Sequence, residues 1–121
     1  MATTALELKK KAAADTIAWA HDALALAFVE IGRAVEADER TIRRWHSREV
    51  LPRRAHQAKL EALRDLRHLL GEVFASEAEA AAWLHTPLRA FRGQAPISVL
   101  RRGRLNAVVE ALATMESGAF L

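Results

Sequence analysis

The feature that most constrains the fold is a stripe of apolar side chains between residues 62 and 74. Apolar residues recur there at steps of three and four, the spacing that places side chains on one face of an α-helix. They are Ala62, Leu63, Leu66, Leu69, Leu70, Val73 and Phe74. Nowhere does a run of β-branched residues alternate with polar ones, as a half-buried strand would require. The sequence therefore predicts an all-α protein.

Start and stop signals divide the rest of the chain into further helices. Asp38 is a candidate N-cap, Pro52 follows a helix end, and Ser76 has the capping-box spacing to Glu79. Thr86 before a proline suggests another helix start. Residues 1–10 are expected to be a frayed or disordered N-terminus. The predicted helices cover about 11–25, 28–36, 39–47, 53–74 and 104–116, with short helices starting at 76, 87 and 96.

Composition excludes several classes of function. The sequence contains no cysteine, so disulfides, thiolate metal sites and thiol nucleophiles are excluded. Its five histidines, His21, His46, His56, His68 and His85, do not have helical metal-ligand spacing, and no metal site or cofactor is predicted. No phosphate loop or nucleophile elbow is present, which argues against an enzyme. No signal peptide or membrane span is recognised, so we expect a cytoplasmic protein without membrane contact.

Basic residues concentrate between positions 40 and 59, where seven bases face the single acid Glu49. Ile42 and Trp45 are three apart in the helix predicted there and can pack inward. The opposite face is rich in arginine, as docking in the DNA major groove requires. Candidate DNA-binding residues are Arg40, Thr41, Arg43, Arg44, Ser47, Arg48, Arg53 and Arg54. A solvated basic face on an ordinary pair of helices is the alternative interpretation.

Residues 28–52, "FVEIGRAVEADERTIRRWHSREVLP", resemble the helix-turn-helix of Xre-type (Cro/repressor-like) regulators. The matching positions are Ile31-Gly32 in the first helix and Thr41-Ile42-Arg43-Arg44-Trp45 in the second. The corner position that is often glycine in that family is Glu36 here. The resemblance implies a helix-turn-helix bundle, which we place in residues 11–75, and binding to operator DNA.

The stretch 82–100, "AWLHTPLRAFRGQAPISVL", interrupts the alanine- and leucine-rich helices with prolines, glycine and aromatics. Prolines can set helix starts and glycines can end short turns, so the segment predicts a rigid, compact bundle of short helices in residues 76–121. Residues expected to build it are Trp83, Pro87, Phe91, Gly93, Pro96, Gly103 and Gly118. Trp83, Leu84, Phe91 and Leu100 are expected to belong to the core rather than to a contact surface.

Residues 80–121 resemble the toxin-binding domain of the MbcA/ParS/Xre family of antitoxins. The resemblance rests on Trp83-Leu84, Pro87, Phe91, Gly93, Pro96, Leu100, Gly103, Val108, Leu112 and Gly118. Phe91 stands where leucine is more usual, and Arg92 where a small residue is. The resemblance implies that the chain is an antitoxin whose partner is a RES-domain toxin, a class that consumes NAD or transfers ADP-ribose from it.

That resemblance also implies a toxin-binding surface and an assembly. Candidate toxin-binding residues are Arg89, Arg92, Arg101, Arg102, Met115, Glu116, Ser117, Ala119, Phe120 and Leu121. A homodimer is expected because paired half-sites raise DNA specificity, and a hetero-oligomer is expected with the toxin. Two alternatives remain open: a stand-alone transcriptional regulator whose C-terminal half dimerises, and an interaction module that has lost DNA binding.

Overall fold

The structure, a computed structural model, describes residues 4–118. Within this range the chain forms seven α-helices and one short 3-10 turn, and no β-strand, which confirms the all-α prediction. The elements in chain order are α1 (Ala5–Asp22), α2 (Phe28–Val35), α3 (Glu39–His46), α4 (Arg54–Val73), α5 (Glu77–Leu84), η1 (Arg89–Phe91), α6 (Pro96–Arg101) and α7 (Leu105–Glu116).

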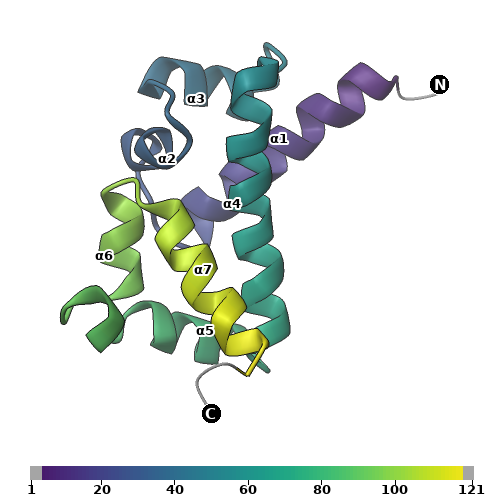
Figure 1. The fold of residues 1–121 in the computed structure, drawn as a ribbon. Helices are drawn as coiled ribbons and strands as arrows, with labels where there is room; N and C mark the ends of the chain where they lie inside the picture. The colour runs from purple at the N-terminus through teal and green to yellow at the C-terminus, as the bar shows by residue number, and fades with distance from the viewer. Residues whose placement is uncertain (1–3, 119–121) are drawn as a thin grey trace.

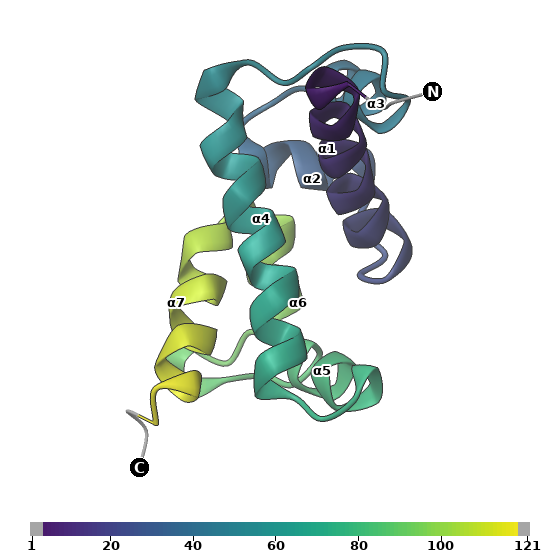
Figure 2. The same cartoon turned by 90° about the vertical axis from the view of Figure 1, so that its right-hand side faces the viewer.

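Helix α4 runs through the molecule and joins its two ends (Figure 1). Helices α1, α2 and α3 gather around its first half, while α5 and α7 pack against its second half (Figure 2). The apolar stripe predicted for this helix is its buried face: Leu63 and Leu66 are fully buried, and Leu70 nearly so. One hydrophobic core extends from Ile17 in α1 to Leu112 in α7. The helix-turn-helix part and the C-terminal part therefore share a core through α4.

The first helix begins earlier than expected. Residues 5–10, expected to be frayed or disordered, are helical. The reason is local: Thr4 accepts a hydrogen bond from the Glu7 amide at 3.1 Å, and the Glu7 carboxylate accepts one from the Thr4 amide. This capping box satisfies two amides that a helix start would otherwise leave unpaired. The spacing of Thr4 and Glu7 is visible in the sequence and is sufficient to predict this start.

Other helix ends lie close to their predicted positions. Asp38 caps α3 by accepting from the Thr41 amide at 2.7 Å, and Ser76 caps α5 by accepting from the Glu79 amide at 3.2 Å. The reciprocal bond of Glu79 goes to the Ala75 amide rather than to that of Ser76. Gly118 follows α7 with φ of 74°, the left-handed geometry expected of a helix cap.

The Thr86–Pro87 pair is not a helix start, contrary to our expectation. The Thr86 hydroxyl donates to the Ala82 carbonyl and so closes the end of α5 instead. After Pro87 the chain turns back on itself, and the amides of Leu88 and Gly93 bond to the carbonyls of Gln94 and Leu88 respectively. Pro96, in contrast, occupies the first turn of α6 as predicted. The backbone therefore makes a tight looped turn, residues 88–94, with η1 inside it.

Gly103, between α6 and α7, lies against α2 and so forms part of the contact between the two ends of the molecule. Its φ is 86°, and a β-carbon there would lie 2.6 Å from the Arg33 carbonyl oxygen of α2. Any side chain would have to displace backbone. The Arg33 guanidinium donates to the Arg101 carbonyl at 3.3 Å, and the Arg101 side chain pairs with Glu30 of α2 at 3.7 Å. Helix α6 thus packs directly on the first helix of the helix-turn-helix.

Candidate functional sites

The α3 surface (Arg40, Arg43, Arg44, Ser47 and Arg48) is fixed from behind by two anchors. Ile42 is fully buried and Trp45 is 2% exposed, as their spacing predicts. The Trp45 ring meets the His56 ring of α4 edge-on, with centroids 5.0 Å apart. All five members of the surface are exposed. One face of α3 therefore holds the helix in place while the other presents arginine to solvent.

The turn between α2 and α3 is tight because of Gly32. A β-carbon at Gly32 would lie 2.3 Å from the Ala37 carbonyl oxygen, so only glycine lets the chain turn this closely. Glu36 takes the left-handed conformation, with φ of 58° and ψ of 47°, at this corner. This geometry costs a non-glycine residue about 1 kcal/mol. Its carboxylate lies 3.4 Å from the Lys59 ammonium, which offsets the negative charge that the corner introduces.

Neighbouring acids and one aromatic ring hold the arginines of the α3 surface. Arg43 pairs with Glu39 at 2.9 Å, one turn earlier, and its guanidinium lies 4.8 Å from the centre of the Phe28 ring. Arg44 lies 3.5 Å from Glu49. These pairs are exposed, and each contributes at most about 1 kcal/mol. DNA phosphates could replace the carboxylates at little cost.

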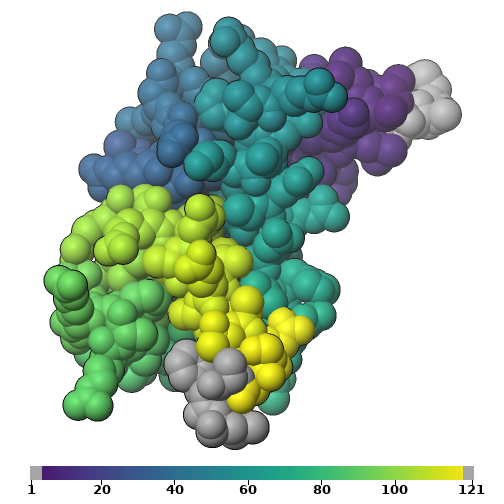
Figure 3. Space-filling view, viewed as in Figure 1, coloured from purple at the N-terminus to yellow at the C-terminus, as the bar shows by residue number. Residues whose placement is uncertain are grey.

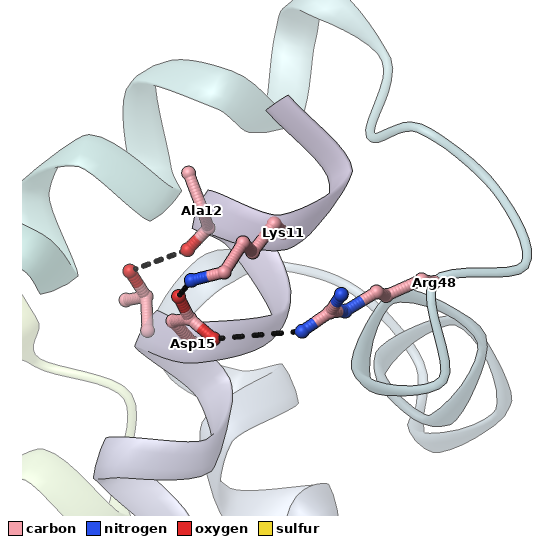
Figure 4. Close-up of polar contacts among 5 residues, drawn as sticks. Lys11, Ala12, Asp15 and Arg48 are labelled. Carbon is pink, nitrogen blue, oxygen red and sulfur yellow. Dashed lines mark hydrogen bonds and ion pairs between the residues drawn. The ribbon is translucent and has the colours of Figure 1, made fainter. Parts of the chain in front are cut away.

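Arg48 extends the α3 surface toward α1. It has φ of 63°, and its guanidinium lies 4.0 Å from the Asp15 carboxylate, which also accepts from the Lys11 ammonium at 2.8 Å (Figure 4). The hydrogen bond from Lys11 is the largest influence that holds the pKa of Asp15 below its ordinary value, and the charge of Arg48 adds to it. The Asp15 carboxylate therefore lies beside Arg48 at the α1 end of the surface.

The remaining DNA-binding candidates take different places. Thr41 is half-buried and its amide is used by the Asp38 cap, whose pKa is lowered by the hydrogen bonds from Thr41. Arg53 and Arg54 are exposed where α4 begins, at the same end of the molecule as α3 (Figure 2). Arg53 and Arg54 therefore add to the exposed arginines at the α3 end of the molecule, while Thr41 serves the cap.

A second surface lies in the C-terminal part. A groove of about 700 Å³ runs between the looped turn of residues 88–94, the end of α6 and the exposed side of α7. Both walls lie on the face shown in Figure 3, where the turn is green and α7 yellow. We call this the α6–α7 groove. Its lining residues are Ala90, Phe91, Arg92, Gln94, Val99, Arg102, Arg104, Ala107, Glu110, Ala111 and Thr114.

Only part of the predicted toxin-binding set lies at this groove. Arg92 and Arg102 line it, and Arg89 is exposed nearby at the start of η1. Arg101 does not line it, because its side chain turns toward Glu30 of α2. Met115 is partly buried against the core.

The last predicted residues lie at the chain end. Glu116 and Ser117 are exposed beyond the groove, at the end of α7. Ala119, Phe120 and Leu121 are outside the described residues. Of the described members of the predicted set, some lie at the groove, Arg101 turns to α2, Met115 packs against the core, and Glu116 and Ser117 lie at the end of α7.

The groove also contains residues that the sequence analysis did not select. Ala107, Glu110, Ala111 and Thr114 share one face of α7 at steps of three and four, opposite the buried Val108 and Leu112. That periodicity is visible in the sequence, yet it does not show which solvent-facing side meets another segment. Arg92 has φ of 56° and precedes Gly93 at 86°. This pair of left-handed residues turns Arg92 toward the groove.

The aromatic residues expected in the core are only partly buried. Leu84 and Leu100 belong to the core, whereas Trp83 and Phe91 pack on its edge. The ring centres of Trp83 and Phe74 are 5.7 Å apart, and Phe91 also lines the groove. Phe91 therefore packs against the edge of the core and also lines the candidate contact surface.

Residues 4–118 contain no cluster of three or more metal-ligating side chains. No helix in this range is long and apolar enough to cross a membrane. The described residues present two arginine-bearing surfaces, the α3 surface and the α6–α7 groove, on one helical core.

The chain is thus a small all-helical protein in which α2, a tight turn and α3 precede a C-terminal part of short helices. Residues 69–118 match the model of the antitoxin Xre/MbcA/ParS C-terminal toxin-binding domain. The mycobacterial cidal antitoxin MbcA of Mycobacterium tuberculosis is 29% identical over 108 residues, covering 89% of this chain and 95% of that protein. A probable mycobacterial cidal antitoxin of the same organism is 28% identical over 93 residues, covering 77% and 78% of the two chains.

A solved structure shares the fold. The crystal structure of the M. tuberculosis MbcT–MbcA toxin–antitoxin complex contains a chain that superposes with a TM-score of 0.56 at 29% identity, covering 89% of this chain and 96% of that one. Together these similarities support an antitoxin of the MbcA/ParS/Xre family. The sequence resemblance to this family is thereby confirmed.

Proposed function

We propose that this chain is the antitoxin of a type II toxin–antitoxin system and acts by binding rather than by catalysis. Its partner is a RES-domain toxin that consumes NAD or transfers ADP-ribose from it, and the antitoxin neutralises the toxin by covering its active site. The main support is the α6–α7 groove, because three arginines line it within the residues that match the toxin-binding domain. The related MbcA was crystallised with its toxin MbcT.

The charge of the groove suggests how a toxin would be held. Arg92, Arg102 and Arg104 approach from the looped turn and the end of α6, while Glu110 is the one acid in the described lining. A groove with mostly basic walls concentrates positive potential and favours an acidic or hydrogen-bond-accepting segment. Phe91 and Val99 add apolar surface between the charges, the mixture typical of a protein interface.

Autorepression is the second part of the proposal, with the α3 surface binding the chain's own operator as a homodimer. It is supported by the anchored, arginine-bearing geometry of α3, with Arg53 and Arg54 placed to contact the flanking backbone. A free-standing transcriptional regulator would share this surface. The antitoxin and the free-standing regulator would both bind DNA, but only the antitoxin would also bind a toxin.

The test is co-expression with the protein encoded next to this chain, purification through a tag on that partner, and measurement of cellular NAD. We expect the two proteins to co-purify, and the partner alone to arrest growth and lower NAD or modify a target with ADP-ribose. Co-expression of this chain should restore growth. An Arg92→Glu/Arg102→Glu variant should fail to restore it, while Arg40→Ala, on the other surface, should restore it fully.

A harmless partner that does not bind would overturn the antitoxin proposal and favour the free-standing regulator. Rescue by the Arg92→Glu/Arg102→Glu variant, with the complex intact, would place the contact elsewhere. Circular dichroism of both variants shows that a loss of rescue is not a loss of fold.

A further inference from the structure

Phe28, the first residue of α2, lies among side chains from two other helices. The His21 ring of α1 lies nearly parallel to the Phe28 ring, with centroids 4.3 Å apart and an interplanar angle of 10°. The Arg43 guanidinium of α3 lies over the same ring, 4.8 Å from its centre. The His46 ring, at the end of α3, is tilted against it at 5.2 Å. Phe28 therefore connects the end of α1 and the start of α2 to an arginine of the α3 surface.

Hydrogen bonds behind Phe28 fix the position of its ring. The His21 Nδ1 donates to the Leu26 carbonyl at 2.8 Å, because a carbonyl oxygen can only accept, and this bond orients the ring that stacks on Phe28. The Ala27 amide donates to the Glu30 carboxylate at 2.8 Å and fixes the start of α2. Phe28 itself is partly buried against the core. The fold thus positions this ring before any partner binds.

Arg43 is also held from a second direction, by an acid. Its Nη2 donates to the Glu39 carboxylate, one turn earlier, at 2.9 Å. Even so, 60% of the Arg43 side chain is exposed. Within residues 4–118, no other arginine of the α3 surface has both an aromatic ring and a hydrogen-bonded carboxylate beside it. Arg43 is therefore open to a partner while its orientation is restricted.

We propose that Arg43 reads a guanine of the operator and that Phe28 is the residue that positions it. A guanidinium donates two parallel bonds to O6 and N7 of guanine only when its planar fork lies in the plane of the base. Contacts to phosphate tolerate more orientations and carry no sequence information. An arginine held by a ring and a carboxylate suits the first task, while Arg40 and Arg44 suit the second. The inference rests on the proposed DNA binding by the α3 surface and divides the work among its arginines.

The first experiment compares two DNA duplexes of equal length by fluorescence anisotropy, the promoter region of the chain's own operon and a random sequence. The ratio of the two affinities measures sequence preference. Arg43→Lys keeps the charge but loses the planar fork, so it should lower this preference about tenfold. The affinity for the random duplex and its salt dependence should stay unchanged. Arg67→Lys is the matched control, because Arg67 also lies over an aromatic ring, that of Trp19, but on α4 outside the α3 surface.

The second experiment applies the same measurement to Phe28. Phe28→Leu should lower the sequence preference about threefold, and Phe28→Tyr, which keeps a ring, should retain it. Phe28→Leu combined with Arg43→Lys should lose no more preference than Arg43→Lys alone, since Phe28 acts through the orientation of the guanidinium. A purely structural role would lower the affinity for both duplexes together. Phe74→Leu is the matched control: its ring is also partly buried, but it lies beside Trp83 in the C-terminal part.

The outcomes distinguish the inference from the function on which it rests. A wild type that binds neither duplex would overturn both the DNA-binding proposal and the inference. Equal affinity of the wild type for the two duplexes would overturn the inference, because no base is then read. A preference that survives Arg43→Lys, or that Arg40→Lys removes instead, would also overturn it. In the supporting outcome, exchanging one G·C pair of the promoter duplex for A·T abolishes the effect of Arg43→Lys and identifies the guanine.

Discussion

The α3 surface and the α6–α7 groove both carry arginine, but they differ in how its charge is balanced. On the α3 surface, Arg43, Arg44 and Arg48 each lie within 4.0 Å of a carboxylate, and of its arginines only Arg40 has no ion pair among residues 4–118. In the groove, Arg92, Arg102 and Arg104 have no ion pair among residues 4–118. An arginine paired with a carboxylate is held in one orientation and adds little net positive potential. An arginine without an ion pair leaves its positive potential available to an acidic partner.

The difference suggests two modes of recognition. A helix that must align with phosphates gains from side chains already oriented by Glu39, Glu49 and Asp15, since less rotamer freedom is lost on binding. A groove that must attract a protein segment gains from arginines that form no ion pair within the described chain and share the lining with one acid, Glu110. We therefore expect substitutions in the groove to change protein affinity more than substitutions on α3 change DNA affinity.

The largest expected effect is a difference in stability between substitutions of two tryptophans, Trp45 behind the α3 surface and Trp83 at the core edge in α5. Trp45→Ala should lower the free energy of unfolding by about 3 to 5 kcal/mol, because Trp45 is 2% exposed and its removal leaves a cavity under α3. Trp83→Ala should cost less, since Trp83 is only partly buried at the core edge. Urea denaturation followed by circular dichroism measures both. Equal losses of unfolding free energy in the two variants would show that the core is packed equally well around both tryptophans.

The next effect tests the unbalanced charge of the groove. Arg92→Glu/Arg102→Glu should weaken toxin binding about 100-fold, or about 3 kcal/mol, because it places acids where the partner is expected to be acidic. Isothermal calorimetry with the co-purified toxin measures the change. Arg101→Ala is the matched control: its side chain turns toward Glu30, so toxin affinity should stay the same. An equally large loss of affinity with Arg101→Ala would move the toxin-binding surface away from the groove.

A smaller effect is expected on α3. Arg40→Ala/Arg44→Ala should weaken binding to the operator of its own operon about tenfold at physiological salt. The log–log salt dependence should become shallower by about one for each phosphate that the variant no longer neutralises. Fluorescence anisotropy at several salt concentrations measures both quantities, with Arg92→Glu/Arg102→Glu as the control that keeps full affinity. An unchanged slope would mean that these arginines do not bind phosphate, and would favour an interaction module without DNA binding.

The smallest expected effect concerns Asp15, the carboxylate beside Arg48 at the end of the α3 surface. The pKa of Asp15 is lowered in the folded state, chiefly by the Lys11 hydrogen bond. Its contribution to stability is therefore complete above its unfolded pKa of about 3.9 and is lost as the pH falls through the lower folded value. Asp15→Asn should reduce the acid-induced loss of stability below about pH 4, measured by thermal melts. A difference between wild type and variant that stays constant from about pH 6 to about pH 3 would contradict this linkage.

Much of the fold was predictable because its determinants are local. The three- and four-residue steps of Leu63, Leu66 and Leu70 fix both the helix and its buried face. The Asp38 cap and the left-handed Gly118 depend on side-chain chemistry within a few residues. The same local logic applies to Thr4 and Glu7, where the predicted start of the first helix was six residues late.

The sites were predictable only in part. Ile42 and Trp45 identified the inner face of α3, so its outer face followed by exclusion. The direction of Arg101 could not follow from sequence, since its partner Glu30 is distant along the chain. The same holds for Glu110 and Thr114 of α7, which enter the groove only because the looped turn is folded against them.

By itself, the sequence determined that the chain is helical, where most helices begin and end, and which family pattern its C-terminal part carries. Tertiary structure decided which arginines are balanced, which line a groove, and that both parts share one core along α4. The physical reason is range: caps and helical periodicity act over one or two turns of chain. Ion pairs and grooves depend on residues far apart in sequence, such as Gly103 against Arg33, that meet only after folding.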